Sequence, residues 1–157
     1  MAVRIFLHGL ESSNQGTKAV FFRERYPDML TPNFSGPLDE RLQGLERILA
    51  GRSGIRLVGS SFGGLMAAVY AMQHEPEVER LVLLAPAIHL LPSTPYPERK
   101  ISVPVWIYHG RNDEVVPLGD VQAAAGRIFP RRTFHVVDDD HYLHNTFKTI
   151  DWDALLQ

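Results

Sequence analysis

The chain of 157 residues contains no cysteine. This absence excludes disulfide bonds, metal sites with thiolate ligands and cysteine nucleophiles. Disulfides stabilise mainly secreted proteins, so a chain without cysteine suits a compartment in which thiols stay reduced. We therefore expect this protein in the cytoplasm.

Long apolar runs are missing as well. The first one, Val3–Leu7, is shorter than the roughly 7–15 apolar residues of a secretory leader, and no small residues follow it as a cleavage site. The most apolar stretch elsewhere, Leu81–Leu91, is interrupted by Pro86 and His89. It falls short of the roughly 20 residues that a membrane-spanning helix needs. The sequence thus predicts neither a leader nor a membrane span.

Charge of one sign is not in excess, because 16 Lys and Arg stand against 18 Asp and Glu. This balance gives no general attraction to nucleic acid or to an anionic membrane, and we expect neither as a partner. Hydrophobic residues make up 45% of the chain and charged residues 22%, which excludes a disordered protein. The length suits a single domain over residues 1–157.

Short apolar runs alternate with longer amphipathic segments along the chain. This alternation predicts an α/β fold with a parallel sheet and helices on both of its faces. Unbroken apolar runs indicate strands that are buried on both faces. The expected strands are Val3–Leu7, Met29–Thr31, Ile55–Gly59, Arg80–Leu84, Val103–Tyr108 and Thr133–Val137. The expected helices lie within Ser13–Tyr26, Leu38–Leu49, Phe62–Gln73, Leu118–Phe129 and Asn145–Leu156.

Residues that follow the strands are where chemistry is expected, because parallel α/β sheets bind ligands outside the carboxyl ends of their strands. The segment Ala85–Ser102 follows one of the strands and contains four prolines. We expect no regular structure in it. Its position makes it a candidate wall or flap over the site.

The sharpest motif is Gly59-Ser60-Ser61-Phe62-Gly63, which matches G-x-S-x-G between an expected strand and an expected helix. A turn this tight has no room for side chains on its flanks and therefore requires the glycines. It holds its central serine in a strained conformation, with the hydroxyl projecting from the sheet. As a bare motif it would also fit a Gly/Ser turn without a role, but its context predicts that Ser61 is a nucleophile.

A serine hydroxyl needs a neighbouring base to attack at neutral pH. Of the seven histidines, His8 and His109 precede glycines at strand ends, which is typical of buried, hydrogen-bonded turn residues. His141 and His144 lie between the last strand and the last helix and are the candidate bases. We favour His141 because it follows the strand more closely. His144 would then begin the helix or support the base.

The acid that orients the base is expected after the preceding strand, where the sequence reads His109-Gly110-Arg111-Asn112-Asp113-Glu114. Asp113 is placed to fix the tautomer of His141 and to stabilise the imidazolium that forms during the reaction. Alone, this aspartate would fit an ordinary turn. We assign Asp113 as the acid because Ser61 and His141 are also present in the expected order along the chain. The adjacent Glu114 is expected to be solvated.

Three consecutive carboxylates, Asp138–Asp140, precede His141 and raise the alternative of a metal site. Neighbouring residues on a loop point in different directions, and no spaced pair of histidines accompanies them. We expect instead a solvated turn that carries His141 into the site, with neither a metal nor another cofactor.

Together these motifs resemble the α/β-hydrolase superfamily, in which nucleophile, acid and base follow one another along the chain as Ser, Asp and His. The resemblance spans nearly the whole sequence. It implies that Ser61 is the nucleophile, Asp113 the acid and His141 the base. The motifs that carry it are His8-Gly9-Leu10, Gly59–Gly64, Gly110–Pro117 and Asp140-His141.

The resemblance also implies an oxyanion hole formed by the backbone N–H groups of Phe62 and Leu10, with Glu11 as the alternative to Leu10. The start His8–Ser13 and the short chain are similar to small bacterial esterases of the YqiA type. Compared with larger members, the antiparallel strands that usually open the fold and the helical cap domain are missing. A sheet of about six mostly parallel strands in the order 2-1-3-4-5-6 is then expected.

An open site with a serine triad favours small-molecule carboxylic esters of short to medium acyl chains, cleaved through an acyl-enzyme on Ser61. Arg111 is the only nearby cation and is expected at the surface, so we expect no strongly anionic substrate. Thioester or amide hydrolysis with the same triad, and a binding protein without activity, are the alternatives. Apolar residues expected near the site are Leu10, Phe62, Ile88, Leu90, Leu91 and Tyr142.

Overall fold

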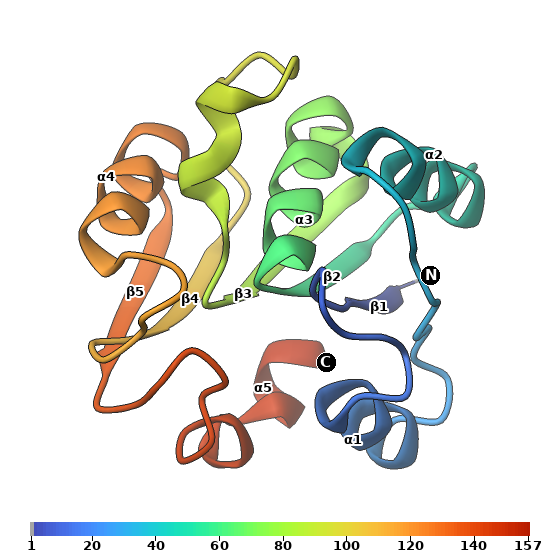
Figure 1. Ribbon diagram of the computed structural model, residues 1–157. Helices are drawn as coiled ribbons and strands as arrows, with labels where there is room; N and C mark the ends of the chain where they lie inside the picture. Colours follow the sequence, from blue (N-terminus) through green and yellow to red (C-terminus); the bar gives the residue numbers. More distant parts are fainter. Residues whose placement is uncertain (1) are drawn as a thin grey trace.

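The five strands of the structure form one parallel sheet. In the computed structural model, which describes residues 2–157, the strands lie side by side in the order in which they follow along the chain (Figure 1). Met1, the first residue of the segment weighed above as a leader, lies outside the described residues. The strands are β1 (Val3–Leu7), β2 (Ile55–Ser60), β3 (Val78–Leu84), β4 (Val105–Gly110) and β5 (Arg132–Val137).

The expected sixth strand is wrong, because only one bridge forms beside β1. Leu30 donates a hydrogen bond of 2.9 Å to the carbonyl of Arg4, and its own carbonyl accepts one of 2.9 Å from Phe6. Pro32 follows two residues later and has no N–H to continue the ladder. The bridge nevertheless lies on the outer side of β1, where the predicted order 2-1-3-4-5-6 requires it.

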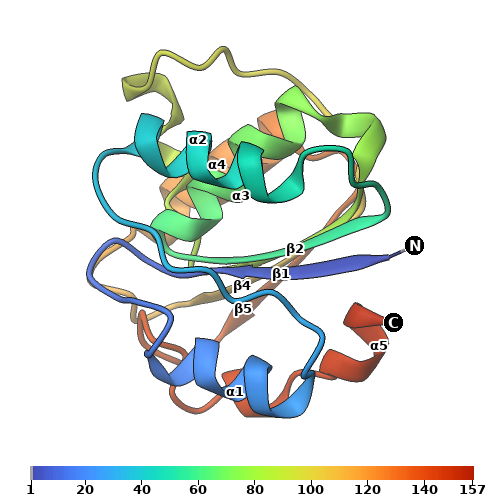
Figure 2. The same cartoon turned by 90° about the vertical axis from the view of Figure 1, so that its right-hand side faces the viewer.

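Helices cover both faces of the sheet, as the sequence predicts. Figure 2 shows three layers, with α2, α3 and α4 on one side of the strands and α1 and α5 on the other. Within residues 2–157, no helix combines the length and the apolar character needed to cross a bilayer, and no cap domain interrupts the order of elements. The helices are α1 (Thr17–Arg25), α2 (Leu38–Leu49), α3 (Phe62–Gln73), α4 (Leu118–Ile128) and α5 (Trp152–Leu156).

Two apolar clusters hold the layers together, and the central strands supply both. Leu57 and Leu81 point into the cluster beneath α2, α3 and α4, whereas Val58 and Val82 point into the one beneath α1 and α5. All four are at most 1% exposed. Burial of such side chains stabilises the fold by about 1.5–3 kcal/mol each, which explains the unbroken apolar runs of the sequence.

Two expected elements differ from those observed. The last helix occupies only the end of the expected range Asn145–Leu156, because a 3₁₀ turn (Phe147–Thr149) precedes it and Asp151 caps its start by accepting the N–H of Ala154. The segment 85–102, expected without regular structure, contains the 3₁₀ helix Ile88–Ser93. This helix packs against α3 and α4.

Glycine is required where α3 begins against β1. A Cβ added to Gly63 would lie 2.0 Å from the carbonyl oxygen of Leu7, and one added to Gly59 would lie 2.4 Å from the carbonyl oxygen of Gly63. All of these contacts are with backbone, which cannot swing aside as a flexible side chain does. The turn between β2 and α3 therefore fits only without these side chains.

We predict that Gly63→Ala lowers the free energy of unfolding by at least ~2 kcal/mol, because the added methyl overlaps the β1 backbone. Gly119→Ala is the matched control, since Gly119 lies on α4 and a Cβ there meets no atom within 4 Å. Urea unfolding followed by circular dichroism measures both. Equal stability of the two variants would contradict the proposed close approach.

Candidate active site

Ser61 lies in the turn between β2 and α3 with a backbone that a serine rarely adopts. Its φ is +55° and its ψ is −116°, which confirms the strained conformation expected from the motif. Such a conformation costs about 1–3 kcal/mol. Within residues 2–157, Ala85 and Leu143 are the other two non-glycine residues with positive φ. All three lie in loops at the carboxyl ends of strands, so strain gathers at one edge of the sheet.

The structure brings Ser61, His141 and Asp113 together. Nε2 of His141 lies 3.1 Å from Oγ of Ser61, and Nδ1 of His141 lies 2.8 Å from Oδ2 of Asp113. A carboxylate only accepts hydrogen bonds, so Nδ1 carries the proton and Nε2 is free to accept the serine hydroxyl. The imidazole side chain is 11% exposed and the Asp113 side chain is fully buried.

Four groups hold the buried Asp113 carboxylate. Its Oδ1 accepts the N–H groups of Val115 and Val116, each at 2.8 Å. Nε2 of His109 lies 3.3 Å from Oδ2, the oxygen that also faces His141. The same Nε2 donates to the carbonyl of Val116 at 2.9 Å, and burial lowers the pKa of His109. The carboxylate is therefore fixed in orientation.

The loop that carries His141 is built around Asp139. This side chain is 4% exposed and accepts the N–H groups of Asp140, Asn145 and Thr146 at 2.8–3.0 Å. The expectation of a solvated acidic turn is thus wrong for Asp139, because its carboxylate replaces backbone partners inside the loop. No cluster of three potential metal ligands occurs among residues 2–157.

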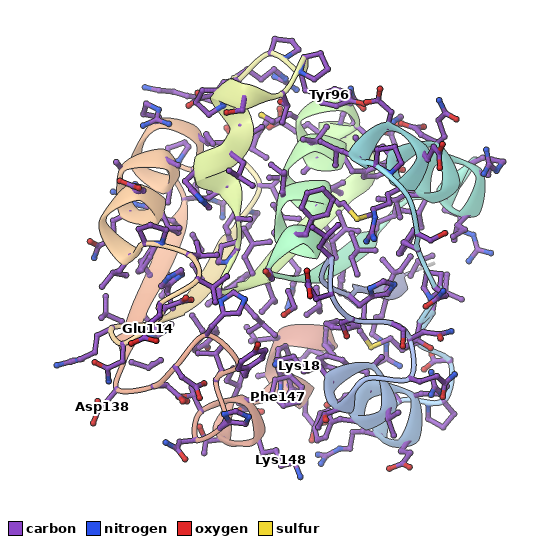
Figure 3. The ribbon with its side chains drawn as sticks, in the orientation of Figure 1. Lys18, Tyr96, Glu114, Asp138, Phe147 and Lys148 are labelled. Carbon is purple, nitrogen blue, oxygen red and sulfur yellow. The ribbon has the colours of Figure 1, made fainter. Side chains whose placement is uncertain are left out.

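Lys18 ties the same loop to α1. Its Nζ donates a hydrogen bond of 2.8 Å to the carbonyl of Tyr142 and lies 5.5 Å from the ring centroid of Phe147. Figure 3 shows Lys18 and Phe147 next to each other at the border between α1 and the C-terminal segment. Burial lowers the pKa of Lys18. This contact ties the residue that follows His141 to α1.

His144 and Glu114, the neighbours of two site residues in the sequence, are not part of this arrangement. The side chain of His144 is 69% exposed, and its Nδ1 lies 2.6 Å from Oδ2 of Asp140. Glu114 is exposed and is labelled in Figure 3 at the outer surface, beside Asp138. His144 thus supports the loop, and Glu114 is solvated as expected.

Two backbone N–H groups that the sequence predicts as oxyanion donors have no acceptor in the part of the protein that the structure describes. Within the described residues, neither the N–H of Leu10 nor that of Phe62 donates a hydrogen bond to the protein. His8 shapes this loop: its Nε2 accepts the N–H of Phe34 at 2.8 Å, so its Nδ1 carries the proton and donates to the carbonyl of Gly9 at 2.7 Å. A peptide N–H points opposite to its carbonyl, so the N–H of Leu10 points away from the His8 ring.

Apolar side chains at the rim divide into two groups. Leu10, Leu90 and Tyr142 are 53%, 37% and 59% exposed, and the Tyr142 ring lies 5.4 Å from that of His141. Ile88 and Leu91, expected near the site as well, are buried in the core instead. The 3₁₀ helix turns these two residues toward α3 and α4, which the sequence alone did not indicate.

Two functional candidates escaped the sequence reasoning. His109 was expected as a buried turn residue, which is confirmed, but its contact with Asp113 was not foreseen. The spacing of four residues between His109 and Asp113 was the only feature of the sequence that could have indicated this contact. Arg41 is the second, a cation on the apolar side of a predicted helix, and it is buried near the serine turn.

No family model and no curated protein sequence matches this chain, but solved structures do. Alpha/beta hydrolase domain-containing protein 10 from mouse is 20% identical, with a TM-score of 0.75 over 88% of this chain and 81% of its own. Est1E from Butyrivibrio proteoclasticus is 18% identical, with a TM-score of 0.75 over 98% and 85%. The chain has the α/β-hydrolase fold.

A protein of the alpha/beta hydrolase superfamily from Xanthomonas campestris has the same fold at 26% identity, with a TM-score of 0.73 over 95% of this chain and 93% of its own. The α/β-hydrolase fold expected from four short motifs is thereby confirmed. The narrower similarity to the YqiA type stays a prediction.

Proposed function

We propose that this protein is a serine hydrolase that cleaves carboxylic esters through an acyl-enzyme on Ser61. The observation that supports it most directly is the continuous chain of contacts from Ser61 Oγ through both nitrogens of His141 to Asp113. Each member comes from a different loop at the carboxyl edge of the sheet. Packing alone does not require a strained serine and a buried carboxylate to meet the same imidazole.

In the first step His141 accepts the hydroxyl proton of Ser61 at Nε2 while Oγ attacks the ester carbonyl. Asp113 keeps the proton on Nδ1 and stabilises the imidazolium. Collapse of the tetrahedral intermediate breaks the bond to the alcohol, which leaves with the proton from His141. The acyl group stays on Ser61.

In the second step His141 accepts a proton from water at Nε2, and the resulting hydroxide attacks the acyl-enzyme. The carboxylic acid leaves, and the proton returns from His141 to Oγ of Ser61. Asp113 keeps its charge throughout.

Stabilisation of the oxyanion falls to the N–H groups of Phe62 and Leu10. Phe62 is the first residue of α3, where N–H groups lack partners within the helix and the helix dipole is positive. The neutral His8 ring holds the preceding peptide of the Leu10 loop, and this supports Leu10 rather than Glu11 as the second donor. Donors that are oriented before the reaction add about 2.7–4 kcal/mol each to such catalysis.

Exposed apolar side chains around an uncapped serine support esters of short to medium acyl chains. Leu10 and Tyr142 offer contact to a few methylene groups but do not enclose a long chain. A structure of Est1E holds ferulic acid, a carboxylic acid, which supports an acyl product for the present site as well. Esters need less help in leaving-group departure than amides.

We predict that a fluorophosphonate probe labels the wild-type protein and that Ser61→Ala abolishes both labelling and ester hydrolysis, because Oγ forms the covalent bond. Ser60→Ala is the matched control, one residue away at the end of β2, and it should remain labelled. Mass spectrometry of the labelled peptide locates the adduct. Labelling of the Ser61→Ala variant would refute the assignment.

The choice of base is tested by two alanine variants. We expect His141→Ala to lower kcat/KM for p-nitrophenyl acetate by at least about 10³-fold, because the hydroxyl then lacks its proton acceptor. His144→Ala, which removes an exposed ring paired with Asp140, should change it less than about threefold. The reverse ranking would move the base to His144.

Chain-length preference is a separate prediction. Across p-nitrophenyl acetate, butyrate, octanoate and palmitate, we expect kcat/KM to be highest for butyrate or octanoate, since the exposed rim contacts only a few methylene groups. Initial rates below the solubility limit of each ester measure it. A maximum at palmitate would show that a long acyl chain is accommodated.

A further inference from the structure

Arg41 is a buried cation without an anionic partner. It lies near the amino end of α2 and is 4% exposed, and its Nε donates to the carbonyl of Gly36 at 2.8 Å. Its Nη1 is covered and has no hydrogen-bond partner, and Nη2 donates none within residues 2–157. Nη2 is not fully covered, so this end of the guanidinium is accessible to solvent.

The nearby carboxylates do not neutralise it. Asp39 accepts a hydrogen bond of 2.5 Å from Tyr96, and the Glu40 carboxylate turns back against Gly36. Within the described chain, neither forms an ion pair with Arg41, whereas Arg56, whose Nε is likewise covered and unpaired, has Glu79 at 2.9 Å. A buried charge without a partner destabilises the fold.

Stability of α2 gives no reason for this cation. Arg41 shares the buried side of the helix with Leu42, Leu45 and Leu49, a side where apolar residues stabilise the fold. A positive charge near the amino end also opposes the helix dipole. A neutral side chain could donate to Gly36 without either penalty.

The guanidinium of Arg41 contacts the side chain of the residue next to the nucleophile. Its Cζ lies 5.4 Å from the ring centroid of Phe62, the residue after Ser61. It is also close enough to His8 for its charge to act on that ring. His8 is followed by Gly9, where an added Cβ would lie 3.4 Å from Cβ of Ser61. Arg41 thus lies against the residue that follows the nucleophile.

We propose that Arg41 binds a carboxylate carried by the substrate, so that the preferred esters are anionic. This inference rests on the proposed ester hydrolysis. The uncovered Nη2 forms no hydrogen bond within residues 2–157 while Nε holds Gly36, so it can donate a charge-assisted hydrogen bond to a carboxylate oxygen. A single guanidinium balances one negative charge, which favours a carboxylate over a phosphate dianion. A substrate with one carboxylate remains compatible with the expectation that the substrate is not strongly anionic.

Two matched pairs of esters test this proposal. The acyl-side pair is mono-p-nitrophenyl adipate and p-nitrophenyl hexanoate, which differ by a carboxylate in place of a methyl group. The alcohol-side pair is 4-acetoxybenzoate and its methyl ester. For each pair, kcat/KM of the anionic ester is divided by that of the neutral ester. Wild type, Arg41→Gln, Arg41→Lys and the control Arg47→Gln are compared, the last lying exposed on the same helix.

We expect Arg41→Gln to lower this ratio about 10- to 100-fold for at least one pair, mainly through KM, because charge-assisted hydrogen bonds are lost. Arg41→Lys should restore part of it, and Arg47→Gln should leave it unchanged. A ratio that is the same in all four proteins, or that falls equally in Arg47→Gln, would overturn the proposal. If Arg41→Gln fails to fold, the Arg41→Lys ratio decides, since the shorter lysine side chain ends before the position of Nη2.

Failure of the proposed function gives a different result. In that case Ser61→Ala would hydrolyse all four esters as wild type does. Calorimetric binding of benzoate, which carries the carboxylate but no ester bond, to the wild-type protein, and its loss in Arg41→Lys, then still tests the carboxylate site. Equal binding to both proteins would refute it.

Discussion

The close approach of α3 to β1 is the constraint on which the site depends. Gly63 lies against the carbonyl of Leu7 with no room for a Cβ, and this brings the first turn of α3 beside the loop after β1. Ser61 is then held from two directions. Its N–H donates to Leu84 and its carbonyl accepts from Ala87, both at 2.9 Å. These bonds offset the strain of its backbone and aim the hydroxyl away from the sheet.

The buried polar side chains around this turn differ in how their charge or hydrogen-bonding groups are satisfied. The carboxylates of Asp113 and Asp139 are buried, and each accepts several hydrogen bonds. Burial lowers the pKa of both His8 and His109, and each ring donates a hydrogen bond to a backbone carbonyl. Arg41 is buried with no anionic partner within residues 2–157, and its guanidinium lies over the ring of Phe62, next to Ser61 in the chain. That contrast is the reason for assigning it a ligand.

Regular elements with strong periodicity could be predicted from the sequence. The helices Leu38–Leu49 and Phe62–Gln73 are confirmed to the residue, because their apolar residues recur at helical spacing and Pro37 and Ser61 directly precede them. Local patterns failed where distant partners decide. Met29–Thr31 forms one bridge instead of a strand, and the segment after β3 contains a 3₁₀ helix that includes Pro92.

The sequence by itself determined the α/β alternation, the serine turn and the loops that carry Asp113 and His141, since strand ends and glycines are local features. Only the tertiary structure decided that His141 rather than His144 faces Ser61, that His109 contacts Asp113, and that Arg41 lies over the ring of Phe62. These are contacts between residues far apart in the chain or on opposite sides of a loop. They depend on how the parallel strands and their helices pack, which no spacing in the sequence records.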